Sequence, residues 1–264
     1  FAKIHQAFFS DTKTAHNQLE AMNNAIAGNI VSKFICGKIK NQRNLVKYFS
    51  KYSKRNSEVI TEFKNTVVTK LTEQINKLRK LAAKNLSELQ SGLFMLEAQA
   101  AGAYWNFIRY LISPYISFPG RHHQNATDLT NQLLNYGYGI LYSRIWEALI
   151  KARLDPNIGY LHANAPDRPA LVFDFIEEFR PQAVDRVVVA LINKKQGILK
   201  TKVNRLTEPT RKLIAQKVTE RLNRPEKFRG KEMNLTEIIN FQATQVAKYI
   251  NGTIPTYKPY IAKW

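Results

Sequence analysis

The chain has 264 residues, 44% of them hydrophobic, and its 40 Lys and Arg against 20 Asp and Glu give a formal net charge of +20. This length fits one large domain or two small ones, and no apolar run is long enough to predict a membrane span. A balance this basic points to a polyanionic partner, of which nucleic acid is commoner than a membrane surface. The single cysteine, Cys36, excludes a disulfide framework and fits a reducing, cytoplasmic compartment.

Helical spacing of apolar residues dominates the first half of the chain. It covers residues 3–50, then a polar amphipathic helix or two over residues 57–90. A strongly apolar helix is expected over residues 91–113, ended by Pro114. After a loop, Asp128 is expected to cap a second apolar helix over residues 129–153.

The second half continues the helical pattern with more interruptions. A helix begins near Ala170 and is interrupted at Pro181, and the apolar run VDRVVVALIN follows. Residues 194–231 hold thirteen Lys and Arg against three acidic residues, with turns expected at Gly197 and Gly230. A last helix covers about 234–251. The sequence predicts an all-α helical domain over residues 1–250 and an extended tail over residues 251–264, PTYKPYIAKW included.

Ligand-type side chains occur in three separate apolar segments. Glu97 lies in LFMLEAQAAGAYW, His162 ends DPNIGYLH, and Asp174 and Glu177 share one helix face in LVFDFIEEFRP. Taken singly, each has a structural reading: a buried Glu paired with an Arg, or a His that is simply hydrogen-bonded. Glu178 is interpreted as a surface charge on a more polar side of its helix.

Together these residues favour a divalent cation. One imidazole nitrogen with two or three carboxylates suits Mg²⁺ or Mn²⁺ better than a structural Zn²⁺, which would favour Cys ligands. Such a cation can polarise a phosphoryl oxygen and stabilise charge on an attacking or leaving oxygen.

A one-sided basic interval lies between Glu20 and Glu58, where no acidic residue occurs. Lys38, Lys40 and Arg43 in this interval are predicted to contact DNA phosphates, and Gly37 is expected to permit a turn that directs the lysines outward. The alternatives are that this face is merely solvated or that it meets an acidic protein.

Four sequence blocks, in order over about residues 28–193, resemble the CRISPR-associated integrase/endonuclease family, the larger protein of the spacer-acquisition module (Cas one). EAQAAGAYW resembles the Glu-centred helix of that family, and ATDLTNQLLNYGYGILYSRI resembles its Asp-x-x-Asn-x-Leu-Leu-x-x-Gly-Tyr segment. LDPNIGYLH followed by DRPALVFDFIEEFRPQAVDRVVVALIN resembles its His-containing loop and acidic helix. IVSKFICGKIKNQRNLVKYF is similar to its Gly-Lys-x-x-Asn-Gln segment.

The resemblance implies the helical catalytic domain of that family, with Mg²⁺ or Mn²⁺ held by the residues that match the metal-binding positions: Glu97, His162 and Glu177. Asp174 matches a further acidic catalytic residue close to the metal. Arg121, which is also expected to contact DNA, and Asn131 match positions that flank the site. The β-rich N-terminal domain of the family is expected to be missing from this chain, and what precedes Phe1 is expected to be either that domain or part of a reverse transcriptase fusion. Residues after about 195 match only loosely.

The implied activity is insertion of short DNA into a CRISPR array, with a 3′-hydroxyl attacking a phosphodiester. Expected partners are double-stranded DNA (prespacer and leader-repeat), the small ferredoxin-like companion (Cas two), a second copy in a homodimer, and a fused or associated reverse transcriptase. Two alternatives stay open at this point. One is a non-catalytic basic DNA-binding scaffold, and the other is a related branched-DNA nuclease outside CRISPR.

Overall fold

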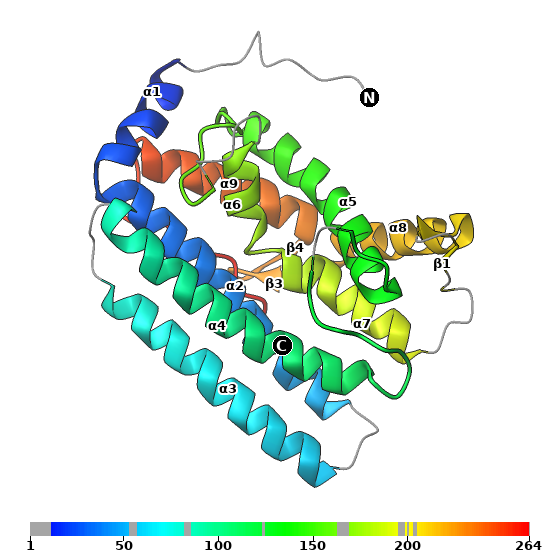
Figure 1. The fold of residues 1–264 in the computed structure, drawn as a ribbon. Helices are drawn as coiled ribbons and strands as arrows, with labels where there is room; N and C mark the ends of the chain where they lie inside the picture. The colour runs from blue at the N-terminus through cyan, green and yellow to red at the C-terminus, as the bar shows by residue number, and fades with distance from the viewer. Residues whose placement is uncertain are drawn as a thin grey trace.

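The structure is a computed structural model, and it describes residues 12–52, 57–81, 86–122, 125–162, 169–194, 199, 201–202 and 205–263. The described part is mainly helical, as the sequence predicts (Figure 1). None of its helices has the combination of length and apolarity that crossing a bilayer would require.

Three long helices form one side of the molecule. They are α2 (Ala25–Lys51), α3 (Ser57–Lys80) and α4 (Leu86–Ile112), which pack against one another side by side (Figure 1). Short segments α1 (Thr12–Glu20) and η1 (Ala21–Asn23) precede them. The Asn24 side chain caps α2 by accepting a hydrogen bond from Ile26 N. The apolar helix expected over residues 91–113 begins earlier than predicted, at Leu86. The polar helix before it ends at Lys80.

The turn expected at Gly37 is wrong, because α2 passes through this residue without a break. A Cβ atom at Gly37 would lie 3.0 Å from Pro259 Cβ and 3.2 Å from Glu178 Cγ. Glycine here therefore allows the tail and the Glu178 segment to approach the helix closely, rather than bending it.

The second group of helices packs around α5 (Leu129–Lys151). It contains α6 (Ala170–Ile176), the π-helix η2 (Pro181–Asp185), α7 (Arg186–Asn193), α8 (Glu208–Asn223) and α9 (Leu235–Ile250). Asp128 caps α5 as predicted, since its side chain accepts from Asn131 N at 2.9 Å. The interruption predicted at Pro181 is also confirmed, and the chain passes there into the wider π-helical turn.

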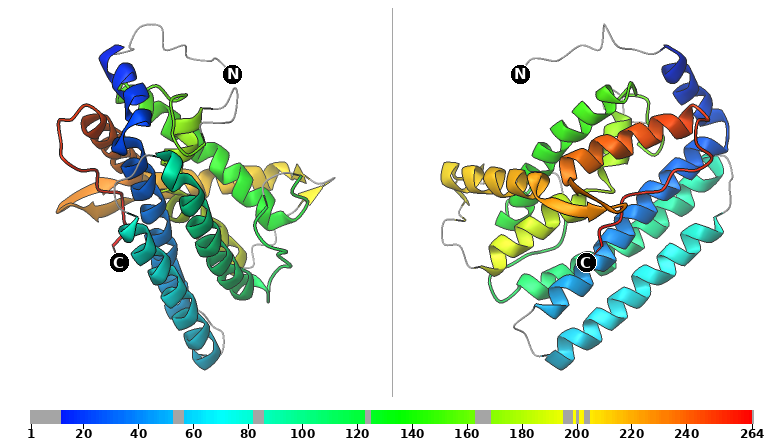
Figure 2. Two further views of the ribbon diagram at one scale, coloured as in Figure 1. Left: turned by 60° about the vertical axis from the view of Figure 1, so that its left-hand side comes forward. Right: turned by 180° about the vertical axis from the view of Figure 1, so that it is seen from behind.

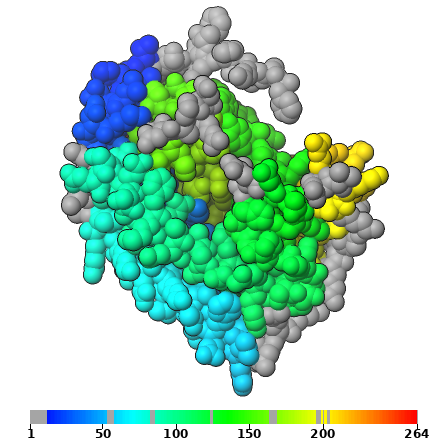
Figure 3. Space-filling view, viewed as in Figure 1, coloured from blue at the N-terminus to red at the C-terminus, as the bar shows by residue number. Residues whose placement is uncertain are grey.

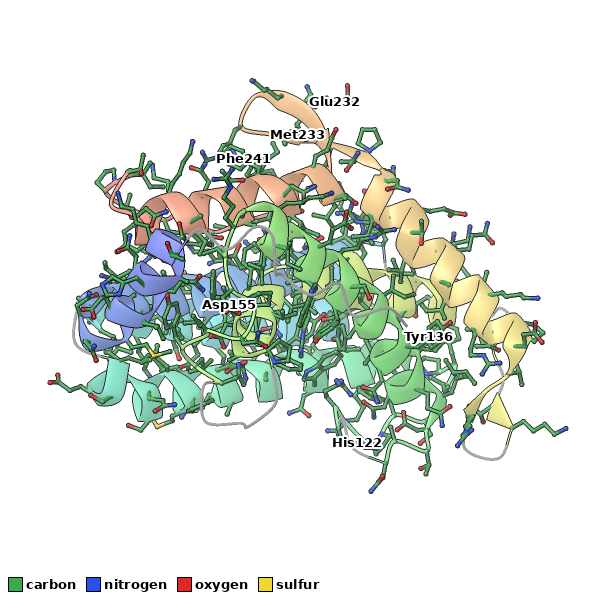
Figure 4. All side chains as sticks on the ribbon, turned by 90° about the horizontal axis from the view of Figure 1, so that it is seen from above. His122, Tyr136, Asp155, Glu232, Met233 and Phe241 are labelled. Atoms are coloured by element: carbon green, nitrogen blue, oxygen red, sulfur yellow. The ribbon has the colours of Figure 1, made fainter. Side chains whose placement is uncertain are left out.

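Two small antiparallel hairpins interrupt the helices of the second half. They join β1 (Thr201–Lys202) to β2 (Arg205–Leu206) and β3 (Pro225–Phe228) to β4 (Lys231–Asn234). The turn predicted at Gly230 is confirmed: Arg229 and Gly230 have φ of 50° and 81°, as a two-residue hairpin turn requires. Glu232 and Met233 lie on the second hairpin, beside the helix that carries Phe241 (Figure 4).

The tail after α9 has no helix or strand over residues 254–263, yet it packs into the same core. Tyr257 and Tyr260 are buried, and the tail runs along α2 on the rear of the molecule (Figure 2). Asn41 anchors it, donating from Nδ2 to Tyr260 O (3.0 Å) and accepting at Oδ1 from Ala262 N (2.9 Å). Asn44 Nδ2 donates to Ala262 O at 2.8 Å.

Glu178 is completely buried beneath this tail, so its interpretation as a surface charge is wrong. Its carboxylate accepts from Tyr257 Oη at 2.6 Å and from Tyr260 N at 2.8 Å. Burial raises the pKa of Glu178 to about 8, although the Tyr257 and Tyr260 donors oppose that shift.

Replacing Glu178 should test this buried contact. Glu178→Ala leaves two buried donors unpaired, and we expect a loss of about 3 kcal/mol in the free energy of unfolding. Glu178→Gln keeps the size and an acceptor oxygen, so it should cost less than about 1 kcal/mol. Urea unfolding of the two variants measures both values, and a mild effect of the alanine variant would contradict the buried position.

A second test compares two glycines of α5. A Cβ atom at Gly137 would lie 2.6 Å from Val184 Cγ1, whereas nothing lies within 4 Å of a Cβ at Gly139. Gly137→Ala should therefore destabilise by about 1–3 kcal/mol through overpacking. Gly139→Ala should stabilise by about 0.5–1 kcal/mol, because alanine has the higher helix propensity. Equal shifts of the urea midpoint in the two variants would disprove the close approach of α5 and η2.

Candidate active site

Three helices bring two acidic side chains and one lysine together. Lys38 Nζ, from α2, lies 2.5 Å from Glu97 Oε1 of α4 and 2.5 Å from Glu177 Oε2 at the end of α6. The three side chains are 13%, 17% and 6% exposed. Because both carboxylate oxygens touch one nitrogen, they are at most about 5 Å apart. Residues 38, 97 and 177 are thus distant in sequence and adjacent in space.

His162 is held in place by Asp174. His162 Nδ1 lies 2.6 Å from Asp174 Oδ1, and the same carboxylate accepts from the backbone N–H groups of Tyr160 (2.6 Å), Leu161 (3.0 Å) and His162 (3.2 Å). The Asp174 side chain is fully buried, so its oxygens are occupied within the protein. Asp174 therefore positions the loop and the imidazole, and the ring nitrogen Nε2 stays available for other contacts.

The charges of the cluster shift one another's pKa values. Burial alone would raise the pKa of Glu177, but Arg180 and Lys38 outweigh it and lower that pKa. Burial lowers the pKa of Lys38, yet Glu177 and Glu97 raise it overall. For His162, burial is likewise outweighed by Asp174, then Glu177 and Glu97, and its pKa is raised. His162 therefore lies within electrostatic range of both Glu97 and Glu177.

A cavity of about 420 Å³ adjoins this cluster. Its wall includes Lys38 and Arg180 of the cluster, together with Arg109, Arg121 and Trp105. Figure 3 shows a hollow on this face of the molecule, with atoms of α2 and of the α6 region at its floor. A cavity with four cationic side chains in its wall suits an anionic group such as a phosphate.

A buried network that was not predicted from the sequence holds the wall of this cavity in place. Asp185 accepts from Tyr138 Oη (2.5 Å) and Tyr104 Oη (3.0 Å). The guanidinium groups of Arg121 and Arg180 lie 5.3 and 4.8 Å from the centre of the Tyr138 ring. One tyrosine thus fixes two arginines of the cavity wall. In the sequence, the Gly-Tyr pair in LLNYGYG was the feature from which this network could have been predicted.

Asn131 organises the loop that carries Arg121. Its Oδ1 accepts from Arg121 Nη1 at 2.9 Å, and its Nδ2 donates to Gly120 O at 2.8 Å. Asn135 Oδ1 accepts from Arg121 Nη2 at 2.8 Å. Arg121 therefore lies at the cavity with a fixed orientation, and its contact with DNA stays a prediction.

Two of the three predicted metal ligands, Glu97 and Glu177, meet at Lys38, which takes the position between them, whereas His162 pairs with Asp174. Within the described residues, no group of three His, Cys, Asp or Glu side chains is arranged to hold a metal ion. The donor set nevertheless fits a divalent cation. Glu177 Oε2 is buried and is paired with the Lys38 ammonium group at 2.5 Å. An acceptor in that state is suited to a cation.

The predicted basic surface of Lys38, Lys40 and Arg43 needs correction. The three side chains do not share a face of α2. Lys38 points into the acidic cluster, Lys40 lines a cavity beside the tail, and Arg43 Nη1 donates to Thr72 Oγ1 of α3 at 3.2 Å. A count of charges along the chain cannot separate these directions, whereas the 100° step of the helix can.

The Asp185 network should give a distinct pH dependence. Burial raises the pKa of Asp185 from 3.8 to about 6, against the opposing effect of its tyrosine donors. The folded state therefore keeps this proton up to about pH 6, whereas the unfolded chain loses it near 3.8. Stability contributed by protonated Asp185 falls as the pH rises through this window and is constant on either side.

Asp185→Asn removes this titration while keeping one acceptor oxygen. The unfolding free energy of the wild type minus that of Asp185→Asn should decrease on the order of 3 kcal/mol between about pH 4 and pH 6. Urea unfolding at a series of pH values measures the difference. A difference that is independent of pH would mean that Asp185 is ionised throughout.

Comparisons with known proteins agree on one family. The family model described as CRISPR associated protein Cas1 matches residues 2–220. CRISPR-associated endonuclease Cas1 1 of Archaeoglobus fulgidus is 28% identical over 273 residues, which cover 99% of this chain and 79% of the relative. CRISPR-associated endonuclease Cas1 1 of Francisella tularensis subsp. novicida is 31% identical over 236 residues, covering 88% and 67%.

Solved structures show the same fold. A chain of "Casposase bound to integration product" aligns with a TM-score of 0.72 and 24% identity, over 94% of this chain and 68% of its own. A chain of "Partial Cas6-RT-Cas1--Cas2 complex" aligns with a TM-score of 0.78 and 21% identity, over 100% and 77%. The family model covers most of the chain and includes Lys38, Glu97, His162 and Glu177, and this chain therefore belongs to the CRISPR-associated Cas1 family.

Proposed function

We propose that this chain is a metal-dependent DNA endonuclease and integrase, which inserts short DNA into a CRISPR array through attack of a 3′-hydroxyl on a phosphodiester. The endonuclease and integrase class follows from the family and from relatives named as CRISPR-associated endonucleases. The observation that carries the site assignment is the convergence of Glu97 and Glu177 on one point, beside His162 and an arginine-lined cavity.

Glu97, His162 and Glu177 are the residues that would hold Mg²⁺ or Mn²⁺. When bound, such a cation supplies a Lewis acid that polarises the phosphoryl oxygen and stabilises negative charge on the oxygens that attack and leave. Asp174 holds His162 through Nδ1 and thereby leaves Nε2 as the reacting atom. This arrangement favours a ligand role for His162 over transfer of a proton, since both roles use the same nitrogen.

The other residues of the site bind and orient the substrate. Arg109, Arg121 and Arg180 supply fixed positive charge along the cavity wall, where a phosphate can accept from their guanidinium groups. Arg180 Nη1 is also 3.2 Å from Glu177 Oε1, so it links the phosphate-binding wall to the acidic cluster. Lys38 neutralises both carboxylates, and a divalent cation would compete with its ammonium group for the same position.

The proposed assembly follows the family. DNA (prespacer and leader-repeat), the small ferredoxin-like companion, a second copy of the chain and a fused or associated reverse transcriptase are the proposed partners. A structural neighbour whose title names a Cas6-RT-Cas1 chain with Cas2 supports a fold compatible with such an assembly. The presence of a β-rich domain before Phe1 stays a prediction.

Metal binding and activity can be tested together on matched variants. Glu177→Gln removes a proposed ligand, whereas Glu147→Gln removes an exposed carboxylate that pairs only with Arg144 and Lys151. Glu177→Gln should lose Mn²⁺ binding by calorimetry and at least about 100-fold of cleavage and integration rate. Glu147→Gln should match the wild type in both measurements. Lys38→Met, which removes the competing ammonium, should bind Mn²⁺ more tightly than the wild type.

The alternatives have distinct outcomes. A non-catalytic scaffold would bind DNA equally before and after chelation and would cut nothing. A branched-DNA nuclease outside CRISPR would cut forks and flaps in Mn²⁺ without joining DNA ends to a leader-repeat plasmid. If Glu97→Gln instead lowers the melting temperature strongly while Mn²⁺ binding is unchanged, the Glu97–Lys38 pair is structural and the ligand assignment is wrong.

A further inference from the structure

A stripe of lysines follows α2 on the side opposite the active site. Lys33, Lys40 and Lys47 are seven residues apart, so they lie nearly in line along the helix at intervals of about 10.5 Å. Relative to Lys38 they are rotated by about 180–220° around the helix axis. Lys51 continues the stripe, which then spans about 27 Å. These cations therefore cannot contribute to the Lys38 cluster.

The C-terminal tail turns this stripe into one wall of a groove. Viewed from behind, the tail lies along α2, beside the β3–β4 hairpin (Figure 2). A cavity of about 540 Å³ lies along Lys33 and Lys40, and one of about 770 Å³ lies along Lys47 and Lys51. The two cavities share Ile261 and Lys263 of the tail as lining residues, so they adjoin along the tail, and together they are called the groove here.

The groove is positively charged throughout. Seven Lys or Arg side chains line its first cavity, two each from α2, the β3–β4 hairpin and the tail and one from α3, and no acidic side chain does. Within the part of the chain that the structure describes, none of the seven is paired with a carboxylate. Like charges gathered in a concave surface repel one another, and a polyanion in the groove would relieve that repulsion.

Aromatic rings lie at the far end of the groove. Tyr52 is 64% exposed, and its ring centre is 5.0 Å from that of Tyr48 and 5.6 Å from Lys51 Nζ. An exposed tyrosine beside lysines provides a face on which an unpaired base can stack, while the cations follow the phosphates. A duplex keeps its bases stacked inside and cannot use such a ring.

We propose that the groove between α2 and the tail binds a single-stranded nucleic acid, with its phosphates along Lys33, Lys40 and Lys47 and a base on Tyr52. The combination of concave walls, unpaired cations and an exposed ring favours a single strand over a duplex. It also favours it over an acidic protein segment, which would not need the ring. The inference rests on the proposed nucleic-acid substrate, but it needs neither the metal nor the catalytic residues.

The test compares two triple variants with equal loss of charge. Lys33→Ala/Lys40→Ala/Lys47→Ala removes the stripe, whereas Lys64→Ala/Lys70→Ala/Lys77→Ala removes three lysines of α3 that do not line the groove. Binding of fluorescein-labelled dT20, rU20 and a 20-base-pair duplex is measured by anisotropy in EDTA over 50–200 mM KCl. The stripe variant should bind dT20 at least about tenfold more weakly, with a log–log salt slope shallower by about 2. The α3 variant should lose about twofold or less.

The single-strand assignment has further checks. Tyr52→Ala should weaken dT20 binding several-fold, and Tyr52→Trp should restore it. Equal losses for dT20 and rU20 would show that the sugar is not read, and a loss for only one of them would identify the strand as DNA or RNA. Equal losses in the two triple variants, or a loss on the duplex as large as that on dT20, would overturn the proposal.

The catalytic proposal fails independently of this one. The stripe substitutions should weaken dT20 binding in EDTA by the same factor whether or not the chain also carries Glu177→Gln. If cleavage is absent from the wild type while stripe-dependent binding persists, only the proposed function is wrong. If the stripe variant binds dT20 normally while the wild type cleaves and integrates, only the groove is wrong.

Discussion

Burial of four carboxylates within twelve residues of one segment constrains the whole structure. Asp174, Glu177, Glu178 and Asp185 are each 4% exposed or less. A buried carboxylate is costly unless it is paired or hydrogen-bonded, so each one requires partners from another part of the chain. The α6–η2 segment therefore determines which other elements must surround it.

Each of the four acids binds a different element. Asp174 organises the loop that carries His162, and Glu177 attracts Lys38 from α2. Glu178 binds the tail through two tyrosines, and Asp185 binds tyrosines of α4 and α5. Of the four, Glu177 is the one paired with both a lysine and an arginine, Lys38 and Arg180. The other three acids hold the neighbouring elements in place through hydrogen bonds.

The sequence predicted the helices well because their apolar spacing and caps are local signals. Glu97, His162 and Glu177 were predicted as metal ligands because ligand-type residues in apolar surroundings are rare and because the motifs resemble a family. Glu178 was misread because its partners lie about 80 residues away, which no local pattern reports. Lys38 was misassigned for a similar reason, since its acidic partners come from α4 and α6.

The Gly-Lys-x-x-Asn-Gln segment, residues 37–42, makes contacts with several segments that are distant in the sequence. Gly37 lets the tail approach closely, Lys38 contacts the carboxylates, Asn41 anchors the tail, and Gln42 lines the arginine-rich cavity. Four residues within two turns of one helix thus serve both faces of that helix. The residue types were visible in the sequence, but their directions required the structure.

The position of the tail has a consequence for synthesis of the protein. Asn41 and Tyr260 are 219 residues apart in the chain, yet they are hydrogen-bonded beside Glu178. On the ribosome, α2 emerges long before the tyrosines that donate hydrogen bonds to Glu178, so packing around Glu178 must wait until those tyrosines have been made. Such long-range closure slows folding and leaves the half-made core exposed. A nascent chain should therefore lack these contacts of Glu178 until residues 257–260 have been synthesised.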